Sequence, residues 1–178
     1  LPTDTPSLSM HEIEEAKIAP RDLKDEVVFS PISGQVLDLT SVNDPVFSSE
    51  MMGKGAAILP AEGRVYAPAD GTLSLVAETG HAYGIETRDG GEILIHIGID
   101  TVSLGGKHFD VKVHAAQQVK KGDLLGTFDI AGIKSEQLDP TVMVIVTNTL
   151  NYSSIKTIPS FRQTVGVGEQ LLALNTAE

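Results

Sequence analysis

Cysteine is absent from this chain of 178 residues. Its absence excludes disulfide bonds, thiol catalysis and cysteine metal ligands, and it suits a reducing compartment. Long hydrophobic runs are missing as well, because no apolar stretch approaches the roughly 18 residues that a membrane-spanning helix needs. No signal peptide is recognisable either. We therefore expect no thiol chemistry within this segment and no direct insertion of it into a membrane.

Basic residues are scarce. The chain has 13 Lys and Arg against 24 Asp and Glu, which gives a formal net charge of −11 and an isoelectric point near 4.8. Such a surface repels phosphates, so we expect no nucleic acid and no anionic membrane as partner, and a basic protein would be favoured by electrostatic steering. An acidic surface that is merely solvated has the same composition, so charge alone leaves both readings open.

The first 25 residues differ in composition from the rest. They hold three prolines, several Ser and Thr, and a charged run from His11 to Lys17. This pattern is typical of a linker with at most one short helical turn. The chain opens on Leu1, so we expect a fragment of a longer chain. We predict a linker over residues 1–25 and a single domain over residues 26–178.

Beyond the linker, short runs of Val, Ile and Leu alternate with Gly, Pro, Asp and Asn. The strand-sized runs are residues 34–39, 56–59, 72–76, 92–97, 124–128 and 142–147. No long segment keeps a helical period, and helical turns are predicted only at residues 133–137 and 153–156. Many short strands separated by turns predict an all-β fold, an antiparallel sandwich or barrel.

An internal repeat supports a single core. Residues 29–37 resemble residues 66–74 around a Pro-x-x-Gly motif, at an offset of 37 positions. Residues 119–125 resemble residues 165–171 around a Val-x-x-Gly motif, at an offset of 46 positions. Neither half has enough apolar surface to fold alone, so we expect the two halves to pack together.

Two histidines are the most informative candidates for a functional site. His96 lies within a run of β-branched residues, where a polar side chain is costly to bury, and His81 lies shortly upstream with Thr79 two residues before it. The turn signal at residues 88–91 separates two short apolar runs, which predicts a hairpin that brings both imidazoles to one face. A single core histidine held by one backbone hydrogen bond is the simpler reading. Two neighbouring imidazoles instead indicate a reaction or a metal site.

A set of motifs in fixed order resembles a known family. They are residues 67–72, 78–82, 95–102, 119–123 and 144–148, and the string from His96 through Gly-Ile-Asp-Thr-Val is the most specific of them. Together they resemble the glucose-type enzyme IIA domain of the bacterial phosphoenolpyruvate:sugar phosphotransferase system, from about Val27 to Leu174. Residues 43–47 and 104–109 resemble the β-glucoside and sucrose branch, in which this domain is often fused behind a membrane permease.

The resemblance implies a phosphocarrier, and so a phosphotransferase component of coupled sugar uptake. A phosphoryl group would pass from the carrier protein HPr to His96 and then to a cysteine of an enzyme IIB domain. His96 would be the nucleophile, with its second ring nitrogen bonded to the carbonyl of Gly98. His81, oriented by Thr79, and backbone groups near Asp100 would stabilise the phosphoryl oxygens. No nucleotide, Mg²⁺ or other cofactor is implied, and we expect a cytoplasmic domain, tethered to the inner face of the membrane where a permease is fused.

The resemblance also implies an apolar patch around the histidines, ringed by acid, that docks both partners. Its members would be Val46, Phe47, Met52, Tyr83, Leu94 and Val102, with Asp44 and Asp100 as the nearest acids. Ala77 and Ser103 depart from the family pattern, since a phenylalanine and an acid are usual there. His11, His108 and His114 are expected to be exposed or structural and receive no role.

Alternative functions remain at this stage. A zinc-binding β-domain could use His81 and His96 with a carboxylate, although a related β-fold peptidase would need a His-x-His pair that the chain lacks. A biotinyl or lipoyl carrier is disfavoured because such carriers are about half this length and place the modified lysine between methionines, unlike Lys54. A regulatory IIA module fused to a sugar symporter would keep the fold and the phosphorylated His96.

Overall fold

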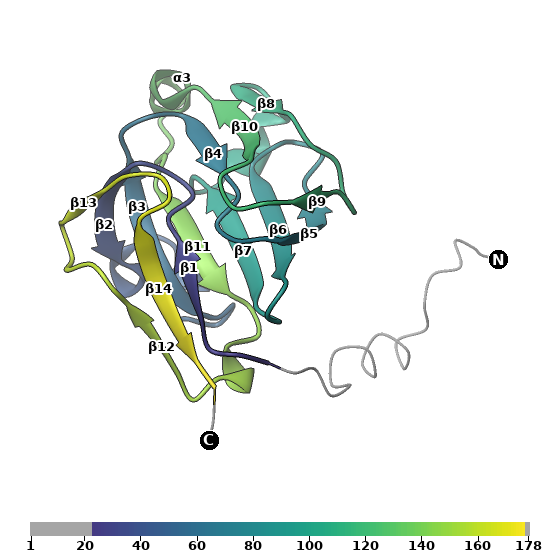
Figure 1. Ribbon diagram of the computed structural model, residues 1–178. Helices are drawn as coiled ribbons and strands as arrows, with labels where there is room; N and C mark the ends of the chain where they lie inside the picture. Colours follow the sequence, from purple (N-terminus) through teal and green to yellow (C-terminus); the bar gives the residue numbers. More distant parts are fainter. Residues whose placement is uncertain (1–22, 177–178) are drawn as a thin grey trace.

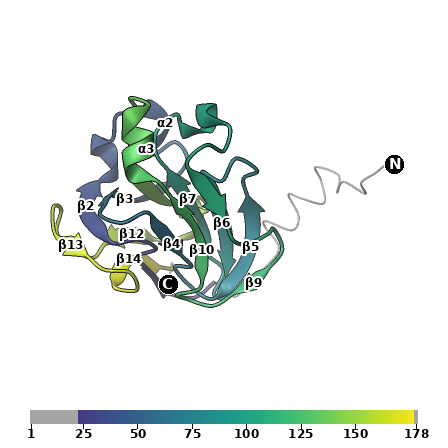
Figure 2. The same ribbon diagram turned by 90° about the horizontal axis from the view of Figure 1, so that it is seen from above.

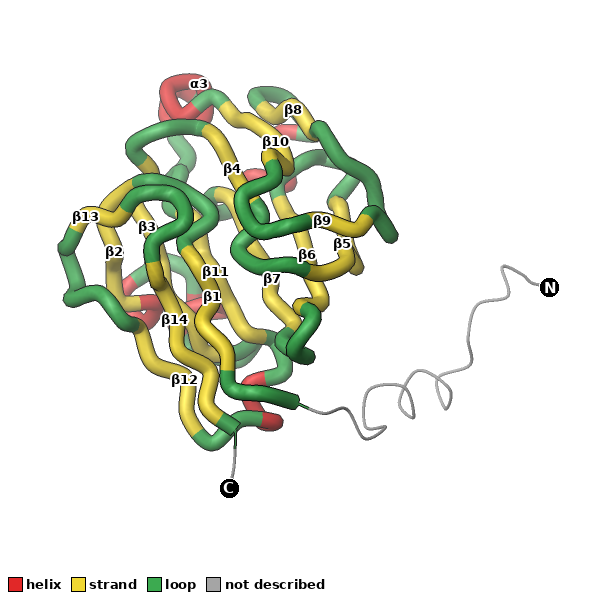
Figure 3. Tube along the Cα trace, in the orientation of Figure 1, coloured by secondary structure: helices red, strands yellow, loops and turns green. Residues whose placement is uncertain are grey.

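Short antiparallel strands joined by turns and loops form the framework of the computed structural model, which describes residues 23–176 (Figure 1). The strands are β1 (Glu26–Phe29), β2 (Gly34–Asp38), β3 (Lys54–Pro60), β4 (Arg64–Tyr66), β5 (Gly71–Val76), β6 (Ala82–Thr87), β7 (Glu92–Ile97), β8 (Phe109–Val111), β9 (Gln118–Val119), β10 (Leu124–Phe128), β11 (Val142–Val146), β12 (Ser154–Thr157), β13 (Thr164–Val165) and β14 (Gln170–Asn175). The helices α2 (Pro45–Ser48) and α3 (Ile130–Ser135) and the 3-10 turns η1 (Leu39–Ser41), η2 (Thr101–Leu104) and η3 (Thr149–Asn151) are short (Figure 3).

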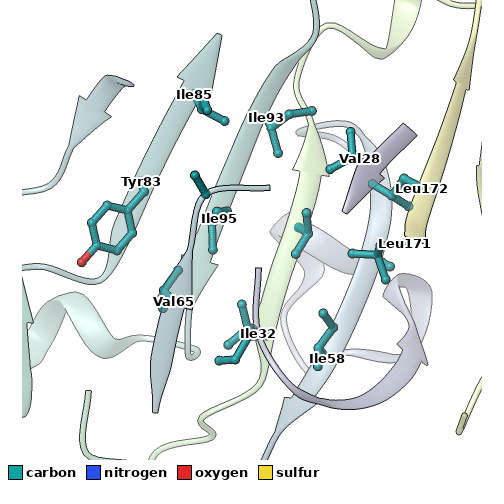
Figure 4. Close-up of a cluster of buried hydrophobic side chains, with 14 of the residues drawn as sticks. Val28, Ile32, Ile58, Val65, Tyr83, Ile85, Ile93, Ile95, Leu171 and Leu172 are labelled. Carbon is teal, nitrogen blue, oxygen red and sulfur yellow. The ribbon is translucent and has the colours of Figure 1, made fainter. Parts of the chain in front are cut away.

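Three sheets enclose the main core. The large sheet has the strand order β13-β2-β3-β11-β7-β6-β5-β9, and two three-stranded sheets, β1-β14-β12 and β4-β10-β8, pack on one of its faces. Every pairing between these strands is antiparallel. Aliphatic side chains from all three sheets meet between the layers (Figure 4). The predicted all-β antiparallel sandwich is confirmed.

The two repeated sequence segments form matching hydrogen bonds with each other. The Phe29 N–H donates to the Pro68 carbonyl at 3.0 Å, and the Tyr66 N–H donates to the Pro31 carbonyl at 2.8 Å, so the two Pro-x-x-Gly segments bind each other reciprocally. Strand β13 pairs with β2 at Gly34 and β9 pairs with β5 at Gly71, again 37 positions apart. The two halves therefore share one core, and the strand order of the large sheet is symmetric about the neighbouring strands β11 and β7.

The other face of the large sheet carries a second, smaller core. It consists of Leu39, Phe47, Ala82, Leu94, Ile99, Met143 and Ile145, with Val42 and Ala77 packed against it. Turn η1 and helix α2 lie over this face and contribute Leu39 and Phe47. Because side chains alternate along a strand, Leu94 and His96 of β7 share this face, whereas Ile93, Ile95 and Ile97 point into the main core.

The six predicted strand segments are observed, with ends shifted by at most a few residues. The helical turn predicted at residues 133–137 is α3, which begins earlier, at Ile130, because the Asp129 side chain accepts the Gly132 N–H and caps it. The helical turn predicted at residues 153–156 is wrong. That segment is strand β12, which pairs with β14 and packs Ile155 against the main core.

The predicted linker and His11 fall mostly or wholly in residues 1–22, outside the described residues. The described chain enters beside the β6–β7 turn, where the Lys24 N–H donates to the Asp89 carbonyl at 3.3 Å. Both described ends lie at the opposite end of the molecule from α3 (Figure 1). Within residues 23–176, no helix is both long and apolar enough to cross a membrane.

Candidate functional site

The hairpin of β6 and β7 brings the two histidines together. Its turn closes through the Thr87 N–H, which donates to the Gly91 carbonyl at 2.8 Å, and its register places Ala82 opposite His96. His81 directly precedes β6, and its carbonyl accepts the Ile97 N–H at 2.7 Å. The ring centroids of His81 and His96 are 5.1 Å apart, with the ring planes at 81°. The predicted hairpin and the predicted proximity of the imidazoles are therefore present.

The hydrogen bond of His96 decides which ring nitrogen is reactive. Nδ1 of His96 lies 2.9 Å from the carbonyl oxygen of Gly98. A carbonyl only accepts, so Nδ1 carries the proton of the neutral ring and Nε2 presents its lone pair. Gly98 has φ +81°, and a Cβ there would lie 2.3 Å from Thr101 Cγ2. Glycine at position 98 thus lets the backbone turn its carbonyl back onto the ring.

His81 is oriented by Thr79. The Thr79 hydroxyl oxygen lies 2.7 Å from His81 Nδ1. When the hydroxyl donates to Nδ1, the neutral ring carries its proton on Nε2 and becomes a donor toward a neighbouring anion. Gly80 between them has φ +79°, and a Cβ there would lie 2.8 Å from Phe109 Cβ, so a tight glycine turn packed on Phe109 fixes this pair.

Electrostatics keep His96 uncharged. Burial lowers the pKa of His96 to about 4, and the neighbouring His81 acts in the same direction. The Gly98 carbonyl and the charges of Asp44 and Asp100 act in the opposite direction but are outweighed. Burial also lowers the pKa of His81. At neutral pH both imidazoles are therefore neutral, and His96 holds a free lone pair on Nε2.

The two acids at the site come from different segments. Asp44 precedes helix α2, and its carboxylate accepts the Val46 N–H at 3.0 Å. Asp100 is exposed, precedes turn η2, and adopts a left-handed backbone conformation with φ 62°. Both carboxylates act on His96 through their charge. They would stabilise positive charge that develops on its ring.

Of the six predicted patch residues, three are exposed and two lie beneath the site. Val46, Met52 and Val102 are exposed, Val102 to 58%, and we call these three the apolar rim. Phe47 is only 5% exposed and Leu94 only 9%, because both belong to the smaller core under the histidines. The Phe47 ring still contacts His96, with centroids 4.8 Å apart. Phe47 therefore packs against His96, and both Phe47 and Leu94 have little surface to offer to a partner.

Tyr83 does not belong to the site, and its predicted place in the patch is wrong. Strand β6 places Ala82 on the His96 face, so Tyr83 points to the opposite face and is buried among Ile85, Ile93 and Ile95 (Figure 4). Burial raises the pKa of its hydroxyl to about 12. A partner on the histidine face cannot reach this ring.

Three hydrogen bonds hold the chain after β7, and two of them involve residues that lie outside the sequence motifs. The buried Thr101 hydroxyl donates to the Ile97 carbonyl and fixes the chain after β7. The backbone of the segment that follows α3 accepts two more bonds, from Gly98 N–H to Thr141 and from Ile99 N–H to Asp139, at 2.8 and 2.9 Å. Thr141 and Asp139 lie 43 and 40 positions along the chain from Gly98 and Ile99, so only the fold reveals these contacts.

For the zinc-binding alternative, the described site supplies two candidate ligands, His81 and His96. Among residues 23–176 there is no group of three or more His, Cys, Asp and Glu side chains that could hold a metal ion. His81 and His96 would have to share a metal with a ligand from elsewhere.

Comparison with known proteins agrees with this geometry. The family model described as phosphoenolpyruvate-dependent sugar phosphotransferase system, EIIA 1, matches residues 26–152. The glucose permease IIA of Mycoplasma capricolum is similar in structure, with a TM-score of 0.77 and 34% identity over 84% of this chain and 96% of that one.

Two relatives differ in length. The glucose-specific EIIA component of Oceanobacillus iheyensis is 42% identical over 89% of this chain and 96% of its own length. The sucrose-specific EIIBCA component of Pediococcus pentosaceus is 51% identical over 86% of this chain, which spans only 23% of that longer relative. With a family match over most of its length, a similar solved structure and the histidine pair in place, this chain belongs to the EIIA family of the phosphoenolpyruvate-dependent sugar phosphotransferase system.

Proposed function

We propose that His96 is the phosphorylated residue of this EIIA domain and that it relays a phosphoryl group from HPr to a cysteine of an EIIB domain. The observation that carries the proposal is the bond between His96 Nδ1 and the Gly98 carbonyl, which leaves Nε2 as a lone-pair nucleophile. The lowered pKa of His96 supports it, since a protonated ring could not attack.

The transfer is a pair of in-line displacements. His96 Nε2 attacks the phosphorus of phosphohistidine on HPr; the new N–P bond forms as the bond to the HPr imidazole breaks, and that imidazole leaves. The His96 ring becomes cationic and keeps its Nδ1 proton, which the Gly98 carbonyl accepts in a hydrogen bond. A cysteine thiolate of EIIB then attacks the same phosphorus, and the electron pair of the N–P bond returns to Nε2.

His81 would stabilise the charge that moves to the phosphoryl oxygens. With Thr79 donating to its Nδ1, its Nε2–H is available to those oxygens, beside His96. The apolar rim of Val46, Met52 and Val102 would exclude water from the junction, while Asp44 and Asp100 would orient basic groups of the partner.

Fusion to a permease is compatible with the position of Lys24 on the domain. Residues 1–25 would be a linker and residues 26–178 the carrier domain. The relatives named EIIBCA components are much longer, since this chain spans only 22% and 23% of two of them. Lys24 enters at the β6–β7 turn, the end of that hairpin far from His81 and His96. A tether at the cytoplasmic face of the membrane would therefore leave the histidines accessible to both partners.

The test is phosphoryl transfer from labelled phosphoenolpyruvate through enzyme I and HPr. We expect acid-labile, alkali-stable label on the wild-type chain and none on His96→Gln with an unchanged fold. His114→Gln is the matched control, because His114 is exposed and its ring nitrogen Nδ1 lies within hydrogen-bond distance of the neighbouring Ala115 carbonyl, far along the chain from His81 and His96. Label on His96→Gln, or none on a folded wild-type chain, would contradict the proposal.

A further inference from the structure

His108 lies between the two segments that hold the site together. Residues 98–108 run from β7 to β8, and residues 129–141 run from β10 through α3 to β11. Backbone bonds join them at both ends: Asp129 N–H donates to the His108 carbonyl at 2.9 Å, and Gly98 and Ile99 donate to Thr141 and Asp139. Figure 2 views the molecule from the end at which α3 lies. Between these backbone bonds, the His108 side chain links the two segments.

The His108 ring lies near two acidic side chains that flank α3, Glu136 and Asp129. Its Nε2 lies 3.0 Å from a Glu136 carboxylate oxygen, and its Nδ1 lies 3.8 Å from Asp129, at the other end of the helix. Lys107 Nζ lies 2.8 Å from the same Glu136 oxygen. Lys107 and His108 together hold the pKa of Glu136 below its usual range. The His108 side chain is only 16% exposed, so the ring is enclosed rather than resting on the surface.

Backbone and helix are both adapted to this ring. His108 has φ 79°, a conformation that a non-glycine residue rarely adopts and that costs free energy unless the surroundings hold it. On α3 the ring faces Gly132, where a Cβ would lie 2.3 Å from His108 Nδ1. A glycine in the interior of a helix is unfavourable by itself, and here its absent Cβ makes the room that the imidazole occupies.

We propose that His108 is a positioning residue for phosphoryl transfer, which clamps residues 98–108 to helix α3 and thereby holds the Gly98 carbonyl on His96. The proposal rests on the proposed role of His96. The clamp acts through α3 on Asp139 and Thr141, whose carbonyls receive the Gly98 and Ile99 N–H groups. It also holds the segment that carries Val102 of the apolar rim and Asp100.

The first variant is His108→Gly, because glycine adopts φ 79° without strain and removes only the clamp. We expect phosphoryl transfer about tenfold slower than wild type, a typical size for a displaced supporting contact. We also expect the ¹⁵N signals of His96 to move from a single Nδ1–H tautomer toward a mixture. Glu136→Gln removes the charge from the other partner and should change both readouts in the same direction. His114→Gly is the matched control and should change neither.

A double variant separates the clamp from general stability. Gly132→Ala places a methyl group where the ring lies, so by itself it should slow transfer as His108→Gly does. It would also approach Asp129 Oδ2 at 2.7 Å, but that carboxylate can rotate. In His108→Gly/Gly132→Ala the space is free, and we expect no loss beyond that of His108→Gly alone, because both changes remove the same contact.

The outcomes separate the two proposals. Wild-type transfer and an unchanged His96 tautomer in His108→Gly, with or without a lower melting temperature, would make His108 a merely structural residue and overturn the inference. A wild-type chain that takes up no phosphate would refute the proposed function, and the ¹⁵N signals of His96 would still test whether His108 holds the Gly98 carbonyl in place.

Discussion

Replacing His96 by glutamine should make the stability of the domain less sensitive to acid. The pKa of a histidine in an unfolded chain is about 6.5, whereas burial and His81 lower that of the folded His96 to about 4. Between these values the unfolded state binds a proton that the folded state rejects. Stability contributed by the neutral ring is therefore complete above pH 6.5 and is lost as the pH falls toward 4.

The size of this effect follows from the two pKa values. Relative to pH 7, proton binding by the unfolded His96 reduces the free energy of unfolding by about 2 kcal/mol at pH 5 and about 3 kcal/mol at pH 4. His96→Gln has no such proton. Its free energy of unfolding should therefore improve relative to wild type by about 2 kcal/mol between pH 7 and pH 5, whatever the variant costs at pH 7.

The assay is urea unfolding followed by circular dichroism, for both proteins at pH 7 and pH 5, with equal urea dependence as the condition for comparing them. All other titrating groups are shared by the two proteins and cancel to first order. A difference between variant and wild type that is the same at both pH values would refute the reasoning, because it would mean that His96 titrates like a histidine in water.

Further expectations concern the neighbours of His96. His81→Gln should accept phosphate from HPr but pass it to EIIB at least about tenfold more slowly, measured by rapid quench, because a donor to the phosphoryl oxygens is lost; normal onward transfer would remove His81 from the transition state. Val102→Ser should weaken docking of HPr in a titration and change the free energy of unfolding by at most about 0.5 kcal/mol, because Val102 is exposed. Leu94→Ala should lower the free energy of unfolding by about 2–5 kcal/mol in thermal unfolding, because Leu94 is buried. Equal stability of the two variants would contradict the assignment of Val102 to the apolar rim and of Leu94 to the smaller core. Gly98→Ala should destabilise by about 1–3 kcal/mol and disturb the His96 tautomer, because a Cβ there meets Thr101; an unchanged tautomer would contradict this.

Local patterns were sufficient for much of the fold. Turn residues at 88–91 between two apolar runs predict the β6–β7 hairpin, and the Pro-x-x-Gly repeat predicts a core shared by two halves. The Val-x-x-Gly repeat marks Val119 and Val165, but the extent of the two-residue strands β9 and β13 is set by their pairing with β5 and β2. The segment at 153–156 shows the same limit. Its polar residues suit a turn, and its pairing with β14 makes it a strand.

The histidine pair and its oriented nitrogens were predictable, and the surroundings were only partly so. Tyr83 is two residues from His81, but the register of β6 against β7 puts Ala82, not Tyr83, beside His96. The burial of Phe47 depends on how α2 folds over the large sheet, which no neighbouring residue reveals. The contact between His108 and Glu136 joins residues 28 positions apart, so the sequence contains both side chains but does not show that they pair.

The central claim is that phosphate resides on Nε2 of His96, and the most direct measurement is a ¹H–³¹P correlation spectrum of the chain phosphorylated through HPr. We expect one phosphorus signal, coupled to both ring carbon protons of His96, with Nδ1 still protonated and bonded to the Gly98 carbonyl. A phosphorus signal on Nδ1 of His96, or on His81, would contradict the account.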